Sequence, residues 1–283
     1  MRPATGGITV NGRRARRSAR GLAAACHPLP CLAVTAFACA YALSVGLGGV
    51  RTALLGAAVL SGQLSIGWCN DAVDAPRDTL AARTGKPVPA GLVSRHTVVV
   101  ACAVAAAACV VLSLALGLRP GLVHLLAVAS AWAYNLWLKS TPASPLPYAL
   151  SFGLLVAFVT LSLPQPGWPP PGVMAAAAAL GVAAHFANTV GDTDADAVTG
   201  VRGLPQIVGP TASLVVTAGL VAAAAGLLLA GAGPHPRYGV GMLLGGVLLG
   251  AAGVLLGGRS RTGRLAFRLT LLAVALVVLG FVA

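Results

Sequence analysis

The stretch Asn70-Asp71-Ala72-Val73-Asp74-Ala75-Pro76-Arg77-Asp78 places three carboxylates close together in a chain that otherwise has very few. The chain has 283 residues and only six acidic ones, all of them aspartates. The other three lie in a second polar stretch, Asp192-Thr193-Asp194-Ala195-Asp196. Carboxylate oxygens grouped in this way suit hard cations such as Mg²⁺, which in turn bind phosphate oxygens. The two acidic clusters therefore predict a site for a divalent cation and a phosphorylated ligand.

The rest of the chain is apolar, with 57% hydrophobic and 9% charged residues. Runs of about 20 apolar residues recur, and each is long enough to cross a hydrocarbon core of roughly 30 Å. This composition predicts an all-α, polytopic membrane bundle of about nine transmembrane helices. Residues 1–28 form a basic tail that we expect to be disordered, and residues 29–283 form the membrane domain. The predicted spans are 31–50, 52–69, 97–118, 120–138, 143–163, 172–191, 210–232, 238–258 and 265–283.

The net charge of +13 does not indicate nucleic-acid binding, because the basic residues lie between apolar runs. If the N-terminus is cytoplasmic and the spans alternate, sixteen of the 19 Lys and Arg residues lie on the cytoplasmic side. The same alternation places both acidic clusters on that side. The high Ala, Gly and Arg content is typical of a GC-rich bacterial genome. We therefore expect an integral protein of a bacterial-type cell membrane, with both clusters cytoplasmic.

The spacing within each cluster aligns carboxylates on one helix face. Asp71, Asp74 and Asp78 are spaced i, i+3 and i+7, and Asp192 and Asp196 are spaced i and i+4. Carboxylates so close together repel one another unless cations share them. Pro76 removes a helical hydrogen bond, so we expect the helix to kink or end there.

Basic and amide side chains accompany the acidic residues in both clusters. Carboxylate-bound Mg²⁺ together with Arg and Lys donors suits a diphosphate and stabilises a leaving pyrophosphate. The alternative is that these charges are only solvated loop residues, which would not explain why both clusters hold every acid of the chain. The candidate diphosphate-binding residues are Asn70, Arg77, Arg83, Lys86, Lys139, Asn188 and Arg202.

Two signatures resemble those of the UbiA-type intramembrane prenyltransferase superfamily. The first is Asn70-Asp71-x-x-Asp74-x-x-x-Asp78, followed by Arg83-x-x-Lys86-Pro87-x-Pro89-x-Gly91. The second is Asn188-x-x-x-Asp192-x-x-x-Asp196-x-x-x-Gly200-x-Arg202-Gly203-x-Pro205. Tyr134-Asn135-x-x-x-Lys139 resembles a further family element, although its spacing is one residue longer than in the quinone-pathway members. The resemblance covers roughly residues 30–283.

This resemblance implies a helical bundle around a central cavity and a prenyl-transfer mechanism. An isoprenyl diphosphate ionises to an allylic cation, and a small aromatic or lipophilic acceptor attacks it while pyrophosphate is released. Arg83, Lys86 and Lys139 would neutralise the pyrophosphate, and Tyr134 would lie near the reacting allyl group, which makes Tyr134 and Lys139 the candidate catalytic residues. No protein partner is implied. Two Mg²⁺ ions would be held by Asp71, Asp74, Asp78, Asp192 and Asp196.

Three other functions are alternatives to prenyl transfer: a terpene cyclase, which fits the sequence equally well, and a transporter and a CDP-alcohol phosphotransferase, which fit it less well. A UbiA-type terpene cyclase needs the same diphosphate site, so the sequence does not separate it from a transferase. An ion-coupled transporter holds its acids near the bilayer midplane, whereas these lie at span ends. A CDP-alcohol phosphotransferase has a glycine directly after its second aspartate, and here Ala75 follows Asp74.

The sequence does not identify the acceptor, the prenyl chain length, the pathway or the oligomeric state. Nor does it assign a role to His96. His124 and His185 lie inside predicted spans, and we expect both to be packed polar residues that bond to a neighbouring helix.

Overall fold

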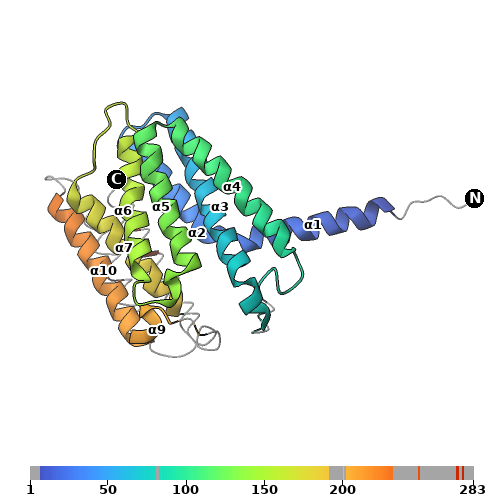
Figure 1. Ribbon diagram of the computed structural model, residues 1–283. Helices are drawn as coiled ribbons and strands as arrows, with labels where there is room; N and C mark the ends of the chain where they lie inside the picture. Colours follow the sequence, from blue (N-terminus) through green and yellow to red (C-terminus); the bar gives the residue numbers. More distant parts are fainter. Residues whose placement is uncertain are drawn as a thin grey trace, which may run out of the picture.

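The structure of the protein, a computed structural model, describes residues 7–80, 83, 85–190, 200, 202–231, 248, 272, 273 and 276. These residues form helices and connecting turns, with no strand among them (Figure 1). The predicted all-α class is therefore confirmed. In chain order the elements are α1 (Gly7–Ala25), α2 (Pro28–Ser44), α3 (Gly49–Leu80), α4 (Arg95–Ala115), α5 (Leu118–Leu136), the 3₁₀ turn η1 (Leu138–Ser140), α6 (Pro145–Leu161), α7 (Pro171–Val190), α9 (Leu204–Val208) and α10 (Pro210–Gly231).

The long helices reproduce the predicted spans as far as the structure describes them. Helices α2 to α7 and α10 correspond to the first seven predicted spans. The last two, 238–258 and 265–283, lie almost entirely outside the described residues. By length and composition α3, α4, α7 and most of α10 are able to cross a membrane. A fifth span results if the end of α1 and α2 count as one, although a 60° bend separates them.

Local sequence signals fix many of the helix ends. Helices α2, α6, α7 and α10 begin at a proline, whose fixed φ suits the first helical turn and whose missing N–H is not needed there. Ser94 caps α4, because its hydroxyl accepts a hydrogen bond from the backbone N–H of Thr97 at 3.0 Å. These signals explain why the predicted starts of the first seven spans lie within three residues of the helix starts. The ends agree less well for two helices, since α2 ends at Ser44 and α3 continues to Leu80, against predicted ends at 50 and 69.

The helices pack side by side as an up-and-down bundle, in which helices consecutive in the sequence are neighbours (Figure 1). The largest core cluster joins α2, α3, α6 and α7 around Leu55, Val59, Phe158 and Val159, each fully buried. Many of the other buried residues are Ala or Gly. Small side chains let helix backbones approach closely, which is how membrane helices associate without a hydrophobic driving force.

Where the structure describes the N-terminal tail, the tail is helical. Residues Gly7–Ala25 form α1, which extends away from the bundle in Figure 1. Its last turn is anchored, since Gly21 and Ala25 are buried and the indole N–H of Trp68 donates to the carbonyl of Leu22 at 2.9 Å. The arginine- and alanine-rich sequence favours a helix, and this anchor supplies the tertiary contact that the composition does not reveal.

Two arginines hold the end of the bundle where α3 begins. The guanidinium of Arg51 donates to the carbonyls of Leu116 at 3.2 Å and Ser162 at 3.0 Å, the C-cap residues of α4 and α6. Arg119, at the start of α5, lies over the ring of Trp168 at 5.7 Å. A cation at helix C-termini satisfies carbonyls that have no partner within their own helix. Arg51 and Arg119 therefore connect neighbouring parts of the bundle at this end.

Candidate active site

The whole first acidic motif lies on the last turns of α3, which continues through Pro76 to Leu80. Of the two expected effects of Pro76, a kink or an end of the helix, the end does not occur. Pro76 provides no N–H for the carbonyl of Ala72, four residues earlier, and the Nε of Arg95 donates to that carbonyl instead at 2.8 Å. Because the helix continues, Asp71, Asp74 and Asp78 share one face, as their spacing predicted.

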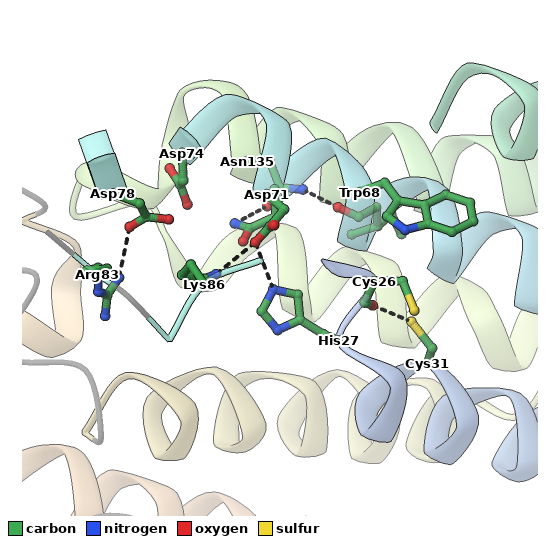
Figure 2. A network of polar contacts seen from close by, with 12 residues as sticks. Cys26, His27, Cys31, Trp68, Asp71, Asp74, Asp78, Arg83, Lys86 and Asn135 are labelled. Atoms are coloured by element: carbon green, nitrogen blue, oxygen red, sulfur yellow. Dashed lines mark hydrogen bonds and ion pairs between the residues drawn. The ribbon is translucent and has the colours of Figure 1, made fainter. Parts of the chain in front are cut away.

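Each carboxylate of the motif pairs with a cation from elsewhere in the chain, and Figure 2 shows the pairs of Asp71 and Asp78. Asp71 lies 3.1 Å from the ammonium of Lys86, and Asp78 lies 3.2 Å from the guanidinium of Arg83. Asp74 forms an ion pair with Lys139. Asp71 and Asp78 are only 2% exposed, so unpaired charges there would be very unfavourable. These pairs explain how three neighbouring carboxylates coexist.

The cations reach the motif from two separate connections. Lys86 begins a tight turn in which the N–H of Ala90 donates to the Lys86 carbonyl at 3.0 Å, and Gly91 adopts a positive φ of 65°. The prolines and the glycine of the first signature therefore build the turn that presents Lys86. Lys139 lies in η1, directly after α5. Arg77, from α3 itself, lies more loosely at 3.9 Å from Asp74.

An amide pair joins the motif to α5. The side-chain amide of Asn70 donates to the side chain of Asn135 at 3.3 Å, and Asn135 donates to the carbonyl of Ile66 at 2.9 Å. Asn135 is buried and was not among the candidate site residues, although it lies within the tyrosine–lysine element. Its role is visible only once α3 and α5 lie side by side.

Sequence reasoning also missed His27. Its Nε2 lies 4.0 Å from a carboxylate oxygen of Asp71, and it has a left-handed backbone with φ 56°. Among the described non-glycine residues it alone has a positive φ, and such strain often marks a functional position. In the sequence His27 is notable only because it precedes Pro28. A proline there predicts the start of a helix, and it does not predict a contact between His27 and α3.

The connection that carries His27 is seated closely on α3. A Cβ at position 67 would overlap the carbonyl of Cys26, so Gly67 permits this approach one turn before Asp71. The thiol of Cys31 donates to the same carbonyl at 2.9 Å (Figure 2). The indole of Trp68 fixes the end of α1 through its bond to Leu22. These contacts direct His27 toward the motif.

The predicted catalytic tyrosine belongs to an aromatic cluster. The ring of Tyr134 packs edge-on against Tyr148 at 5.0 Å and against His185 at 5.5 Å. Tyr148 and His185 stack on each other at 4.6 Å. His185 also bonds to Ser144, and His124 bonds to Ser113 at 2.7 Å, which confirms both histidines as packed polar residues.

The second motif falls largely beyond the described part of the chain. Asp192 and Asp196 lie outside the described residues. Asn188, in the last turn of α7, and Arg202, after the motif, are both exposed. Their assignment to a diphosphate site remains a prediction.

The described carboxylates have the chemistry that a hard divalent cation requires. Asp71 Oδ2 is buried and has no hydrogen-bond partner, so one oxygen is left without a donor. Within the described residues no group of three or more His, Cys, Asp or Glu side chains is arranged to hold an ion alone. The first motif therefore fits one part of a metal site, to which the second motif or a phosphorylated ligand would add further oxygens.

Comparison with known proteins gives a consistent result. The sequence model of the UbiA prenyltransferase family matches residues 29–274, and no curated protein sequence matches the chain. The fold is similar to that of an apo UbiA homolog from Aeropyrum pernix K1, with a TM-score of 0.71 and 20% identity over 88% of this chain and 96% of that chain. A UbiA homolog from Archaeoglobus fulgidus bound to GPP and Mg²⁺ gives a TM-score of 0.65 with 17% identity over 91% of this chain and 99% of that one. A structure of digeranylgeranylglyceryl phosphate synthase gives a TM-score of 0.68 with 15% identity over 94% of this chain and 97% of that chain. At these identities the structural similarities establish the fold, which is a membrane bundle as predicted.

Proposed function

This chain belongs to the UbiA prenyltransferase family, and we propose that it is an integral membrane enzyme that transfers an isoprenyl group. The donor is an isoprenyl diphosphate, the acceptor is a small aromatic or lipophilic molecule, and pyrophosphate is released. The observation that carries the proposal is the row of three carboxylates on α3, each paired with a cation from outside that row. The similar fold of a UbiA homolog bound to GPP and Mg²⁺ supports the same ligand class.

The proposed cofactor is Mg²⁺, with two ions bound. When bound, Mg²⁺ supplies positive charge next to the carboxylates and the diphosphate oxygens. The unpartnered Oδ2 of Asp71 supports a place for such an ion. The residues proposed to hold the ions are Asp71, Asp74, Asp78, Asp192 and Asp196.

The cations of the site would bind the diphosphate. Lys86 and Arg83 retain 22% and 26% exposure of their side chains, so a ligand can reach them while they remain beside the carboxylates. Their ammonium and guanidinium groups donate to phosphate oxygens and stabilise the charge of the leaving pyrophosphate. Lys139 has the same role from η1. We extend the diphosphate-binding set by one residue, His27, beyond the predicted Asn70, Arg77, Asn188 and Arg202.

The reaction follows from this placement of charge. The bond between the allylic carbon and the diphosphate oxygen breaks, and its electron pair leaves with the pyrophosphate. The aromatic face of Tyr134 lies near the electron-deficient carbon and stabilises it. A carbon or heteroatom of the acceptor then forms the new bond and loses a proton.

The proposed orientation places the N-terminus and both acidic motifs in the cytoplasm of a bacterial-type cell. The charge distribution supports it, and Arg51 and Asp71 lie near opposite ends of α3. Their separation by 20 residues corresponds to about 30 Å of helix, roughly the thickness of the hydrocarbon core. Labelling of a cysteine introduced at Gly85 from the cytoplasmic side only would support this orientation.

The test is release of pyrophosphate by purified protein with isoprenyl diphosphates of several chain lengths, with and without an acceptor extract. Release that requires both Mg²⁺ and the extract, and stops with excess EDTA, is the expected result. Release without an acceptor, together with a cyclised hydrocarbon product, would identify a terpene cyclase instead. Absence of release from folded protein under every condition would overturn the proposal and favour a transporter.

A further inference from the structure

Ser144 is a fully buried serine that does not cap the helix it precedes. A serine before a helix usually accepts a hydrogen bond from the second or third helical N–H. In α6 the second helical residue is Leu146, whose N–H donates to the carbonyl of Ala143, and the third is Pro147, which has no N–H. Neither residue donates to the hydroxyl of Ser144, which is therefore available for a tertiary contact.

The hydroxyl joins two segments that are distant from each other in the sequence. It lies 3.1 Å from Nε2 of His185 on α7, and it accepts a hydrogen bond from the backbone N–H of Leu204 at 3.0 Å. The hydroxyl has one hydrogen and a second lone pair left for His185, so it donates to Nε2 or accepts from it according to the tautomer of the ring. His185 is held in place by stacking on Tyr148 at 4.6 Å, which keeps this contact directional.

The two contacts lie on either side of the second acidic motif. His185 precedes Asp192 by seven residues in the sequence, and Leu204 follows Asp196 by eight. Ser144 therefore binds the chain both before and after the motif. Both contacts are made by described residues.

The same junction touches the first motif through Lys139. A Cβ at position 203 would lie 2.7 Å from the carbonyl of Lys139 and 2.9 Å from the hydroxyl of Ser144. Gly203 therefore allows the chain after the second motif to pack directly on η1, whose Lys139 pairs with Asp74. This close approach gives a physical reason for the glycine of the second signature.

We propose that Ser144 is a positioning residue that fixes the second acidic motif relative to the first. It acts through His185 and the backbone of Leu204, and it does not touch the substrate. This proposal rests on the proposed function, in which both motifs serve one diphosphate. Correct spacing of the two motifs then determines how tightly the donor and Mg²⁺ are bound.

The test compares Ser144→Ala with Ser151→Ala. Ser151 is a matched control on α6, the helix that Ser144 precedes, because its hydroxyl donates to the carbonyl of Ala127 at 2.8 Å and lies 3.4 Å from that of Ser130. In Ser144→Ala the KM for the isoprenyl diphosphate and the Mg²⁺ concentration for half-maximal rate should each rise about tenfold, while kcat changes by less than about threefold. Ser151→Ala should retain wild-type values. A merely structural role would instead lower kcat through a smaller active fraction.

A second readout does not depend on activity. Deuterium uptake of residues 186–204 should rise in Ser144→Ala and stay unchanged in Ser151→Ala. Unchanged uptake in folded Ser144→Ala, or increased uptake without a change in KM and Mg²⁺ dependence, would overturn the proposal. If the wild-type protein releases no pyrophosphate, the proposed function fails, and the uptake comparison still decides whether the hydrogen bonds hold this segment.

His185→Phe tests the same contact from its other side, because phenylalanine retains the aromatic packing and removes the hydrogen bond to Ser144. If the contact acts through Ser144, the double variant should be no more impaired than Ser144→Ala alone. Additive losses would show that His185 acts separately. This variant also replaces Ser144→Ala should that protein fail to fold.

Discussion

The two ends of α3 use the same kind of residue for different purposes. At its start, Arg51 bonds to the C-terminal carbonyls of two neighbouring helices, which are fixed parts of the protein. At its end, Lys86, Arg83 and Lys139 pair with carboxylates that lie next to one another on one face. The partners of Arg51 are backbone carbonyls, which stay in place whatever ligand is bound. In a carboxylate–cation pair, by contrast, the carboxylate can also bind a metal ion and the cation can also bind a phosphate. Cations at the end of α3 therefore belong to the candidate site, and those at its start stabilise the bundle.

This comparison makes a strong prediction for Asp71→Asn, which retains the side-chain shape and removes the charge. We expect kcat/KM to fall by about 10³-fold, since a charged ligand of the site is lost. Pyrophosphate release measures the effect, and the melting temperature in detergent verifies folding. Activity within tenfold of wild type would remove Asp71 from the site.

The next largest effect is expected for Lys86→Met, which keeps the length of the side chain and removes its donor. Loss of one phosphate-binding group should lower kcat/KM by about 10²-fold. The KM for the isoprenyl diphosphate should account for part of this loss. A variant that loses only stability would place Lys86 among the structural cations.

Arg51→Met should show the opposite behaviour. Arg51 is exposed, so the loss of its two hydrogen bonds to helix C-termini should cost only about 1–2 kcal/mol of stability. This corresponds to a decrease of about 2–6 °C in melting temperature. Pyrophosphate release at a temperature where the protein is folded should stay within about twofold of wild type; a larger loss would contradict the separation of the two ends.

Arg119→Met should have the smallest effect. An exposed cation–π contact contributes about 0.5–1 kcal/mol, so the melting temperature should fall by at most a few degrees. Activity should not change. An activity loss comparable to that of Lys86→Met would mean that this end of the bundle also participates in function.

Much of the site could be predicted because its chemistry is concentrated in the sequence. The spacing of Asp71, Asp74 and Asp78 placed them on one face, and the structure confirms this on α3. The helix does not end at Pro76, because Arg95, from the start of α4, donates to the carbonyl that Pro76 leaves without its helical partner. A rule about proline considers one helix only and cannot anticipate such a donor.

Residues whose role depends on a distant partner could not be found in this way. His27 has no acidic neighbour in sequence, and it meets Asp71 only because Gly67 lets the connection between α1 and α2 approach α3. Asn135 and Ser144 are likewise ordinary polar residues until α3, α5 and α7 are packed.

The sequence by itself determined the membrane class, most helix boundaries and the two acidic motifs, because apolar length, proline position and residue spacing act along the chain. Only the tertiary structure decided which cation pairs with which carboxylate, where α1 is anchored and what the hydroxyl of Ser144 binds. Ion pairs and hydrogen bonds form between side chains a few ångströms apart in space, and that proximity arises only when the helices pack.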